Sequence, residues 1–463
     1  MNNLKIRLTL MSFLQFFVWG AWLLTIANYW FGTRQWDGTQ FGAVFATMGF
    51  ASLVMPTLTG IIADKWVNAE ILYGILHILY AAVLFYLPEV SSPETFFWVM
   101  LLAMCFYMPT ISLSNSISYT TLKLGQLDVI KTFPPIRVWG TVGFIVAMWI
   151  TNLTGNKATA YQFYIAGAAA LTLGIYAMTL PKCRPQKHIE EQRSFAKLLG
   201  LEAFKLFADY KMALFFIFSM FLGGALQLTN AYGDVFLDEF KLFPQYADSF
   251  VIRYSTIIMS ISQVSETLFI LAIPFFLKHF GIKKVIVIAM FAWVLRFGLF
   301  AYGNPADNLW MIVLSCIVYG MAFDFFNISG SLFVETSTTP KTRSSAQGLF
   351  MMMTNGFGAV FGSLISGWMI DRYFTRNYTD IQSLASSIHT EASNGHLLEF
   401  LKNRGITVLQ NGNLSRAIDV KDWHDIWISF TIYALLITIS FAVLFRHKHN
   451  RAEQEAIDAI SHS

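Results

Sequence analysis

The sequence predicts an all-α, polytopic membrane protein with twelve transmembrane helices in two bundles of six. Of its 463 residues, 55% are hydrophobic and only 13% are charged, whereas about a quarter of an ordinary soluble domain is charged. Apolar segments of about 20 residues, the length that crosses a hydrocarbon core as a helix, occur twelve times. Six of them precede the basic, amphipathic segment PKCRPQKHIEEQRSFAKLLG and six follow it.

Each predicted span is an apolar run with few or no charges. In chain order the spans are 8–31, 40–62, 70–88, 96–121, 134–153, 161–180, 212–236, 249–277, 284–303, 308–334, 344–370 and 425–446. The first follows Lys5 and Arg7 and has no small-residue cleavage site. It is therefore expected to remain as a span and not to be removed as a signal peptide.

These spans divide the chain into three parts. Residues 1–180 form the predicted N-terminal bundle, 181–211 a cytoplasmic linker, and 212–463 the C-terminal bundle, with a long extracytoplasmic loop at 371–424. In folds built from such repeats, the binding site lies near the middle of the bilayer between the repeats. The long loop, rich in Ser, Asn and charged residues, is expected either to fold over the outer entrance or to be a disordered insertion.

Lys and Arg in the connecting segments predict the orientation. With the N-terminus inside, the inner segments hold twenty of them, whereas the short outer loops hold Arg34, Lys157 and Lys241. Short segments rich in Lys and Arg stay on the cytoplasmic side. Both termini are therefore predicted to be cytoplasmic.

The composition excludes several classes of function. The net charge of +4 is small and scattered, so no nucleic-acid partner is expected. Cys105, Cys183 and Cys316 lie far apart without a CxxC or His-flanked pair, so neither a disulfide nor a metal site is expected. The sequence contains no phosphate-binding loop and no hydrolase motif. We therefore expect neither an enzyme, nor a cofactor, nor an ATP-driven pump, and any uphill transport must draw on an ion gradient.

Four ionisable residues fall well within the predicted spans: Arg137, Glu266, Arg296 and Asp324. A charge at a helix centre costs about 2.5–3.5 kcal/mol on insertion scales, so these side chains should face a cavity or one another. One interpretation pairs them as buried salt bridges, and it is favoured for Arg296, which has no polar companion on its helix turn. The other makes Asp324 or Glu266 a proton carrier, because a buried carboxylate readily gains and loses its charge.

Polar and aromatic residues recur at helical spacing, which places them on one face of each span. The sets are Arg137, Thr141 and Phe144 on the fifth span, Gln227 and Asn230 on the seventh, Gln263 and Glu266 on the eighth, and Tyr319 and Phe323 on the tenth. Amides beside a carboxylate suit a polyhydroxylated, uncharged ligand, and the rings suit stacking on a base. The alternative is that such groups only hold helices together. This is favoured for the polar residues of the fourth span, Ser112, Ser114, Asn115, Ser116, Ser118 and Tyr119, and of the eleventh, Gln347, Thr354 and Asn355.

Several motifs resemble those of known families. The loops GIIADKW (60–66) and FLKHFGIKKV (276–285) occupy equivalent positions in the two halves and resemble the signature loops of the major facilitator superfamily. SFLQFFVWGAWL (12–23), FPPIRVWGTVGF (133–144), VYGMAFDFFNISGS (318–331) and SAQGLFMMMTNGFG (345–358) resemble the bacterial nucleoside:proton symporter family, of the nucleoside permease and xanthosine permease type. The resemblance extends along nearly the whole chain, although the 371–424 loop is longer than this family leads us to expect.

The resemblance implies proton-coupled uptake of purine and pyrimidine nucleosides across a bacterial inner membrane, by a protein expected to be a monomer. The family's motif positions fall on Arg137, Thr141, Phe144, Gln227, Asn230, Gln263, Glu266, Tyr319 and Phe323 for substrate binding and on Asp324 for proton coupling. The base is then expected to stack between Phe144 and Phe323, with the ribose held by the amides and Glu266. Two alternatives stay open: a proton-coupled sugar symporter of the same superfamily, and a membrane receptor that binds a ligand without moving it.

Overall fold

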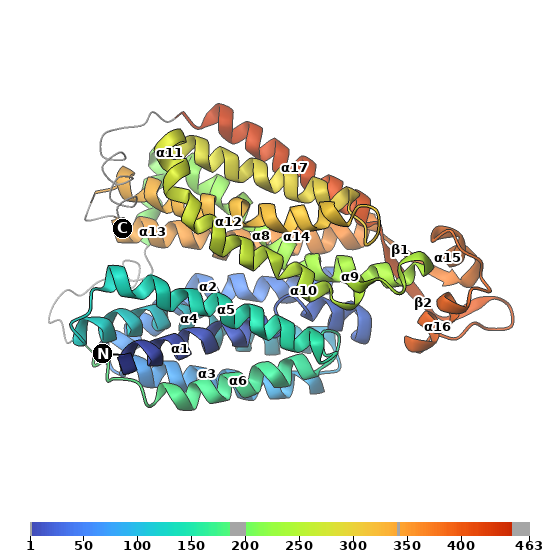
Figure 1. The fold of residues 1–463 in the computed structure, drawn as a ribbon, viewed down its shortest axis with the longest axis horizontal. Helices are drawn as coiled ribbons and strands as arrows, with labels where there is room; N and C mark the ends of the chain where they lie inside the picture. Colours follow the sequence, from blue (N-terminus) through green and yellow to red (C-terminus); the bar gives the residue numbers. More distant parts are fainter. Residues whose placement is uncertain (1, 186–200, 340–342, 447–463) are drawn as a thin grey trace.

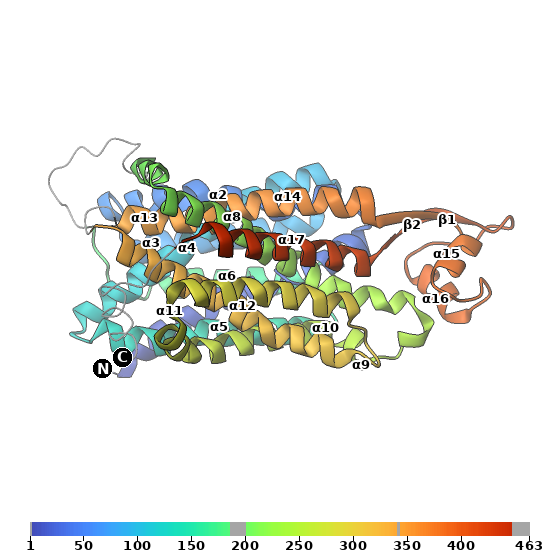
Figure 2. The same cartoon turned by 90° about the horizontal axis from the view of Figure 1, so that it is seen from above.

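The computed structural model describes residues 2–185, 201–339 and 343–446, and it is mostly helical. In Figures 1 and 2 the long helices run side by side along the longest axis of the molecule. Figure 1 shows α1 to α6, the N-terminal half, on one side and α8 to α17, the C-terminal half, on the other. The predicted linker at 181–211 stays a prediction, because its residues 186–200 lie outside the described ranges.

The N-terminal half contains six long helices. They are α1 (Asn2–Gly20), α2 (Gly38–Lys65), α3 (Ala69–Tyr86), α4 (Pro93–Leu124), α5 (Val129–Leu153) and α6 (Tyr161–Ala177), with the short elements η1 (Asn28–Arg34) and η2 (Leu87–Glu89). The carboxylate of Asp37 begins α2 by accepting a hydrogen bond from the backbone N–H of Gln40 at 3.1 Å. The Ser92 hydroxyl begins α4 in the same way with Thr95. Such N-caps satisfy backbone donors that the first helical turn leaves without a partner.

The C-terminal half has more interrupted helices. They are η3 (Leu201–Ala208), α8 (Tyr210–Glu239), η4 (Phe240–Leu242), η5 (Pro244–Tyr246), α9 (Phe250–Arg253), α10 (Ser255–Met259), α11 (Ile261–Tyr302), α12 (Leu309–Ser337), α13 (Arg343–Met351), η6 (Met352–Gly358), α14 (Ala359–Met369), η7 (Ile370–Phe374) and α17 (Trp423–Leu444). The backbone of α11 turns at Gly281, where φ is +74°. Residues with a side chain are strained in this region of φ, so glycine suits the turn.

The helices account for all twelve predicted spans. Among the residues that the structure describes, nine helical stretches are long and apolar enough to cross a membrane. One of them, Ser255–Tyr302, includes the turn at Gly281 and therefore holds the predicted eighth and ninth spans. The first span corresponds to α1, which continues through a turn into η1. The sixth corresponds to the 17-residue α6.

Two seams join the halves. Helix α2 packs along α14, while α5 contacts α10 and α11. The helices approach closely at the first seam: a Cβ atom on Gly42 would lie only 2.4 Å from the carbonyl oxygen of Ser363. Within the N-terminal half, α1 packs on α5 equally closely, since a Cβ atom on Gly143 would lie 2.1 Å from the carbonyl oxygen of Phe13. Small residues permit this approach of helices in a membrane.

The predicted loop at 371–424 is folded. Strand β1 (Thr375–Asp380) pairs antiparallel with β2 (Asn413–Lys421), and α15 (Ile381–Ser387) and α16 (Gly395–Asn403) lie between them in the chain. Leu384, Leu397 and Leu401 belong to a separate apolar core of this outer subdomain, residues 375–421. Figures 1 and 2 show the subdomain beyond α14 and α17, at the opposite end of the molecule from the start of α1. The alternative of a disordered insertion is therefore wrong.

Candidate functional site

A cavity of about 800 Å³ lies between the two halves of the molecule. Side chains of α1, α2, α4 and α5 form one wall, and side chains of α8, α11, α12, α13 and η6 form the other. The nine residues predicted to bind substrate all line this cavity: Arg137, Thr141, Phe144, Gln227, Asn230, Gln263, Glu266, Tyr319 and Phe323. Ligand sites have volumes of about 300–1,000 Å³, so the cavity has room for a small organic molecule.

The wall formed by α5 presents a cation and an aromatic ring. The guanidinium carbon of Arg137 lies 3.9 Å from the centroid of the Phe16 ring. Phe144 meets the Trp19 ring edge-on, with centroids 6.4 Å apart. Both partners come from α1, so the close packing of α1 on α5 fixes the two side chains at the cavity wall.

The opposite wall presents amides and a carboxylate. Gln227 and Asn230 come from α8, and Gln263 and Glu266 from α11. The Oε1 atoms of Gln227 and Gln263 are buried and have no hydrogen-bond partner within the described ranges. A buried acceptor without a partner costs about 1–3 kcal/mol. A ligand hydroxyl or N–H group that donates to these oxygens would remove that cost.

Aromatic rings lie on both walls. The rings of Tyr319 and Phe323, both on α12, are nearly parallel, with an interplanar angle of 3° and centroids 5.8 Å apart. Phe144 lies on the wall formed by the N-terminal half. The cavity can therefore offer a ring to each face of a flat ligand, and stacking of this kind stabilises bound nucleobases.

The charged residues of the site interact without forming close ion pairs. Arg137 and Glu266 lie on opposite walls, and their charges are near enough to interact. Asp324 does not line the cavity: it follows Phe323, its side chain is 5% exposed, and its charge interacts with that of Glu266. Among the residues that the structure describes, no ion pair joins these three. Their interpretation as buried salt bridges is therefore wrong for this conformation.

The predicted salt bridge of Arg296 is also wrong. Its side chain is fully buried in α11 and lies outside the cavity lining. In the described part of the chain its guanidinium group pairs with no carboxylate and binds hydroxyl and backbone oxygens. These partners come from α8, α12 and a distant turn of α11, so the residues of its own helix turn do not reveal them.

Some lining residues were not selected from the sequence. Ser112, Asn115 and Asn355 line the cavity, so for these three the prediction that they only join helices is wrong. It is confirmed for Gln347 of α13, which forms two hydrogen bonds with Ser331 of α12. Ser112 donates within α4, to the carbonyl oxygen of Pro109. Trp19 also lines the cavity, and its indole nitrogen is buried without a partner in the described residues. The spacing of Ser112 and Asn115, three residues apart, was the one signal that could have placed them on the cavity side.

The cavity extends toward the end of the molecule where α1 begins. Thr57 and Asn115 lie in the later parts of α2 and α4, which run back toward that end. Arg137 and Ser345 lie in the early parts of α5 and α13, which start there. The lining residues include none from the ends of α2, α4 and α5 that lie nearest the outer subdomain.

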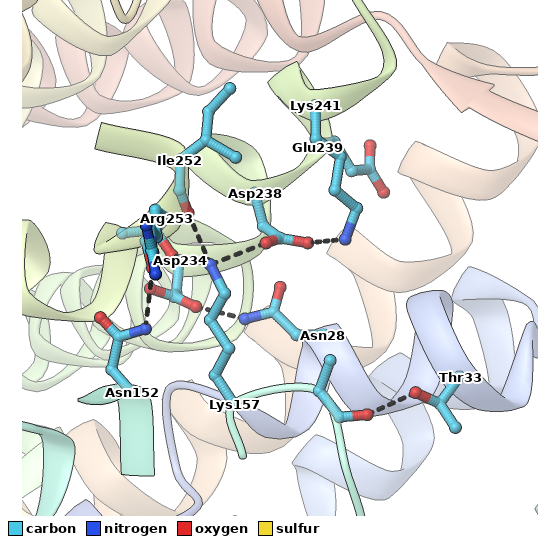
Figure 3. A network of polar contacts seen from close by, with 12 residues as sticks. Asn28, Thr33, Asn152, Lys157, Asp234, Asp238, Glu239, Lys241, Ile252 and Arg253 are labelled. Atoms are coloured by element: carbon cyan, nitrogen blue, oxygen red, sulfur yellow. Dashed lines mark hydrogen bonds and ion pairs between the residues drawn. The ribbon is translucent and has the colours of Figure 1, made fainter. Parts of the chain in front are cut away.

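Polar contacts join the halves at the end that carries the outer subdomain (Figure 3). Lys157, between α5 and α6, forms an ion pair of 2.8 Å with Asp238 of α8 and donates to the carbonyl oxygen of Ile252 at 2.7 Å. Asn28 donates a hydrogen bond to Asp234. Burial lowers the pKa of the Lys157 ammonium, but the carboxylates of Asp238 and Asp234 outweigh this effect and raise it above 10.5. We call these five residues the outer latch.

Comparisons with known proteins agree along the chain. A family model described as "Nucleoside H+ symporter" matches residues 1–393. "Nucleoside permease NupG" of Escherichia coli (strain K12) is 44% identical over 450 residues, which cover 97% of each chain. "Xanthosine permease" of the same organism is 45% identical over 449 residues, again 97% of each chain. The crystal structure of the nucleoside transporter NupG superposes with a TM-score of 0.81 at 44% identity, covering 96% of this chain and 100% of that chain.

Proposed function

Because the chain belongs to the nucleoside H⁺ symporter family, we propose that the cavity between its halves is the nucleoside site. The chain is a transporter and not an enzyme, and it carries nucleosides together with protons as a multi-pass inner-membrane protein. The observation that carries the proposal is the placement of nine residues, selected from the sequence, around one cavity. Rings on both walls and amides on one wall suit a molecule with a flat base and a hydroxylated sugar.

The base stacks between Phe144 and Phe323, which lie on opposite walls. Such stacking contributes about 1–3 kcal/mol per base. The ribose hydroxyls donate to the free oxygens of Gln227 and Gln263, with Asn230 and Glu266 as further partners. Purine and pyrimidine nucleosides share these groups, so the site admits both classes.

Asp324 carries the proton. It lies beside the cavity, directly after Phe323, and its charge interacts with that of Glu266. Two carboxylates that are near each other disfavour a double negative charge, so a proton on one of them stabilises the pair. Arg137 faces Glu266 across the cavity, so loss of the proton strengthens the attraction between the two halves.

Both termini lie in the cytoplasm, as the Lys and Arg residues of the short loops indicate. The cavity then extends toward the cytoplasm, and the outer latch seals the opposite side of the membrane. With this orientation, the transporter is in the inward-facing state of an alternating-access cycle. Release of the latch is required for nucleosides to enter from outside.

Uridine uptake by cells that express the protein tests this function. We expect concentrative uptake that a proton uncoupler abolishes and that unlabelled adenosine inhibits, while a hexose has no effect. Inhibition by the hexose but not by nucleosides would instead identify a sugar symporter. Uridine binding in proteoliposomes without accumulation driven by a pH gradient would identify a receptor.

A further inference from the structure

Arg296, in the second half of α11, is a buried cation that the proposed transport mechanism does not use. None of its surface is exposed, with a relative accessibility of 0%, and it lies outside the cavity lining. No carboxylate pairs with it in the part of the chain that the structure describes. A charge inside the membrane is costly and is generally retained for a function, so its contacts indicate what that function is.

Hydrogen bonds of Arg296 connect three helices. Its Nη1 donates to the carbonyl oxygen of Ser315 of α12 at 2.7 Å and to the hydroxyl of Ser262 in the first half of α11 at 3.4 Å. Its Nε donates to the hydroxyl of Thr229 of α8 at 3.3 Å. The Ser315 hydroxyl in turn donates to the carbonyl oxygen of Arg296 at 2.9 Å. One planar group therefore fixes α8, α12 and the two halves of α11 relative to one another.

The contacted residues lie next to residues that line the cavity. Thr229 directly precedes Asn230, and Ser262 directly precedes Gln263. These two contacts thus act on the same short stretches of α8 and α11 that present amides to the cavity. A shift of Arg296 would move those stretches together.

Two rings also contact the guanidinium group of Arg296. Its carbon lies 4.9 Å from the centroid of the Phe300 ring of the same helix and 4.6 Å from the centroid of the Tyr319 ring. Trp293 meets the Tyr319 ring edge-on at 90°, with centroids 5.9 Å apart, and the parallel Phe323 ring lies 5.8 Å from that of Tyr319. A cation–π contact is stronger when it is removed from water, as this one is. Arg296 therefore also fixes Tyr319, whose ring packs on the Phe323 ring that stacks on the base.

We propose that Arg296 is a positioning residue of the nucleoside site, an inference that rests on the proposed function. It does not touch the substrate. It holds Asn230 and Gln263 at the spacing at which they bind the sugar, and it holds Tyr319 against the Phe323 ring that stacks on the base. A guanidinium group is required because its flat fork reaches several acceptors while it stacks on a ring, whereas a lysine ammonium is a single point of charge.

The test compares Arg296→Lys, which keeps the charge, with Phe297→Leu as the matched control. Phe297 is the next residue of α11. It packs on Trp427 and Phe430 of α17 and on Trp293, but it does not line the cavity. We expect Arg296→Lys to raise the KM for uridine uptake about tenfold, equivalent to about 1.4 kcal/mol, with little change in the maximal rate per folded transporter. Phe297→Leu should lower the melting temperature and leave KM unchanged.

Smaller changes keep the inference testable if Arg296→Lys does not fold. Thr229→Val and Ser262→Ala each remove one acceptor of the guanidinium group, and each should raise the KM about threefold, in line with one lost hydrogen bond. Unchanged KM values in both would overturn the inference. So would an unchanged KM in folded Arg296→Lys, or an equal KM rise in Phe297→Leu. Absence of uridine uptake by the wild-type protein would overturn the proposed function instead.

Discussion

Replacing Lys157 with Met should open the outer end of the transporter. The ammonium group of Lys157 binds Asp238, the carbonyl oxygen of Ile252 and the hydroxyl of Ser255 across the two halves. Hydrogen bonds to charged groups contribute about 1.5–3 kcal/mol each. Lys241 still pairs with Asp238 after the substitution, which removes most of the cost of leaving that carboxylate without a partner. We therefore expect the state with the closed outer end to be destabilised by about 3 kcal/mol relative to the open state, which shifts the equilibrium between the two about 100-fold toward the open state.

A cysteine at position 256 reports this opening. Thr256 is fully buried on α10, near the outer latch. In intact cells, Thr256→Cys should react slowly with a membrane-impermeant thiol reagent, and adding Lys157→Met should accelerate the reaction. Lys241→Met is the matched control, because Lys241 also pairs with Asp238 but lies in the same half. An unchanged labelling rate in the Lys157→Met background would refute the reasoning, as would equal acceleration by Lys241→Met.

Four further predictions concern the proton, the base, the packing and pH. Asp324→Asn should abolish concentrative uptake but preserve uridine exchange, because only the proton carrier is lost; wild-type accumulation would move that role elsewhere. Phe323→Ala should raise the Kd for uridine about 5- to 150-fold in calorimetry, the equivalent of about 1–3 kcal/mol of stacking, and an unchanged Kd would contradict stacking there. Gly143→Ala should lower the melting temperature, because its Cβ would lie 2.1 Å from a carbonyl oxygen. Gly60→Ala should not, because no other atom lies within 4 Å of the Cβ position at Gly60. Equal melting temperatures of the two variants would contradict this packing. Because the pKa of Lys157 is raised, its ion pair is lost only as pH rises above 10.5. The rate of labelling of the cysteine at position 256, normalised to that of the unfolded protein, should therefore stay constant between about pH 6 and 9. Faster labelling at higher pH in that range would show that the lysine deprotonates there.

Helical periodicity in the sequence predicts much of the site. Arg137, Thr141 and Phe144 can be assigned to one face because an α-helix repeats every 3.6 residues. Polar residues are rare in membrane spans, so the few that are present are informative. The family motifs join this face to the corresponding faces of α8, α11 and α12, and all nine residues line the cavity.

Contacts between helices could not be predicted in the same way. Spacing shows that Ser112 and Asn115 share a face, but not whether that face meets another helix or a cavity. Arg296 illustrates the same limit, because its partners are hydroxyl and backbone oxygens from α8, α11 and α12. Lys157 and Asp238 lie in different halves of the sequence, and the packing of the two halves on each other brings them together.

The outer subdomain contributes to closure as well. At its end nearest the membrane helices, Lys421 forms an ion pair of 2.6 Å with Glu239 of α8. It also contacts the N-terminal half. The side chain of Gln35 donates to the carbonyl oxygen of Arg404, the backbone carbonyl oxygen of Gln35 accepts from Arg416, both at 3.0 Å, and the ammonium of Lys421 lies 3.9 Å from the centroid of the Phe31 ring. The subdomain therefore moves with the C-terminal half, and opening of the outer end breaks its bonds to Gln35.

These two sets of contacts differ in strength. Hydrogen bonds such as those of Gln35 contribute about 0.5–1.5 kcal/mol each, and water replaces them when they break near the surface. The side chain of Lys157 is about half as exposed as that of Lys241, 14% against 31%, and leaves several oxygen partners when the halves separate. The latch therefore dominates closure and the subdomain adds a smaller, graded share. Removal of Lys157 should thus shift the equilibrium strongly from the closed to the open outer end. The hydrogen bonds of Gln35 remain, so the outer end still closes during part of each transport cycle.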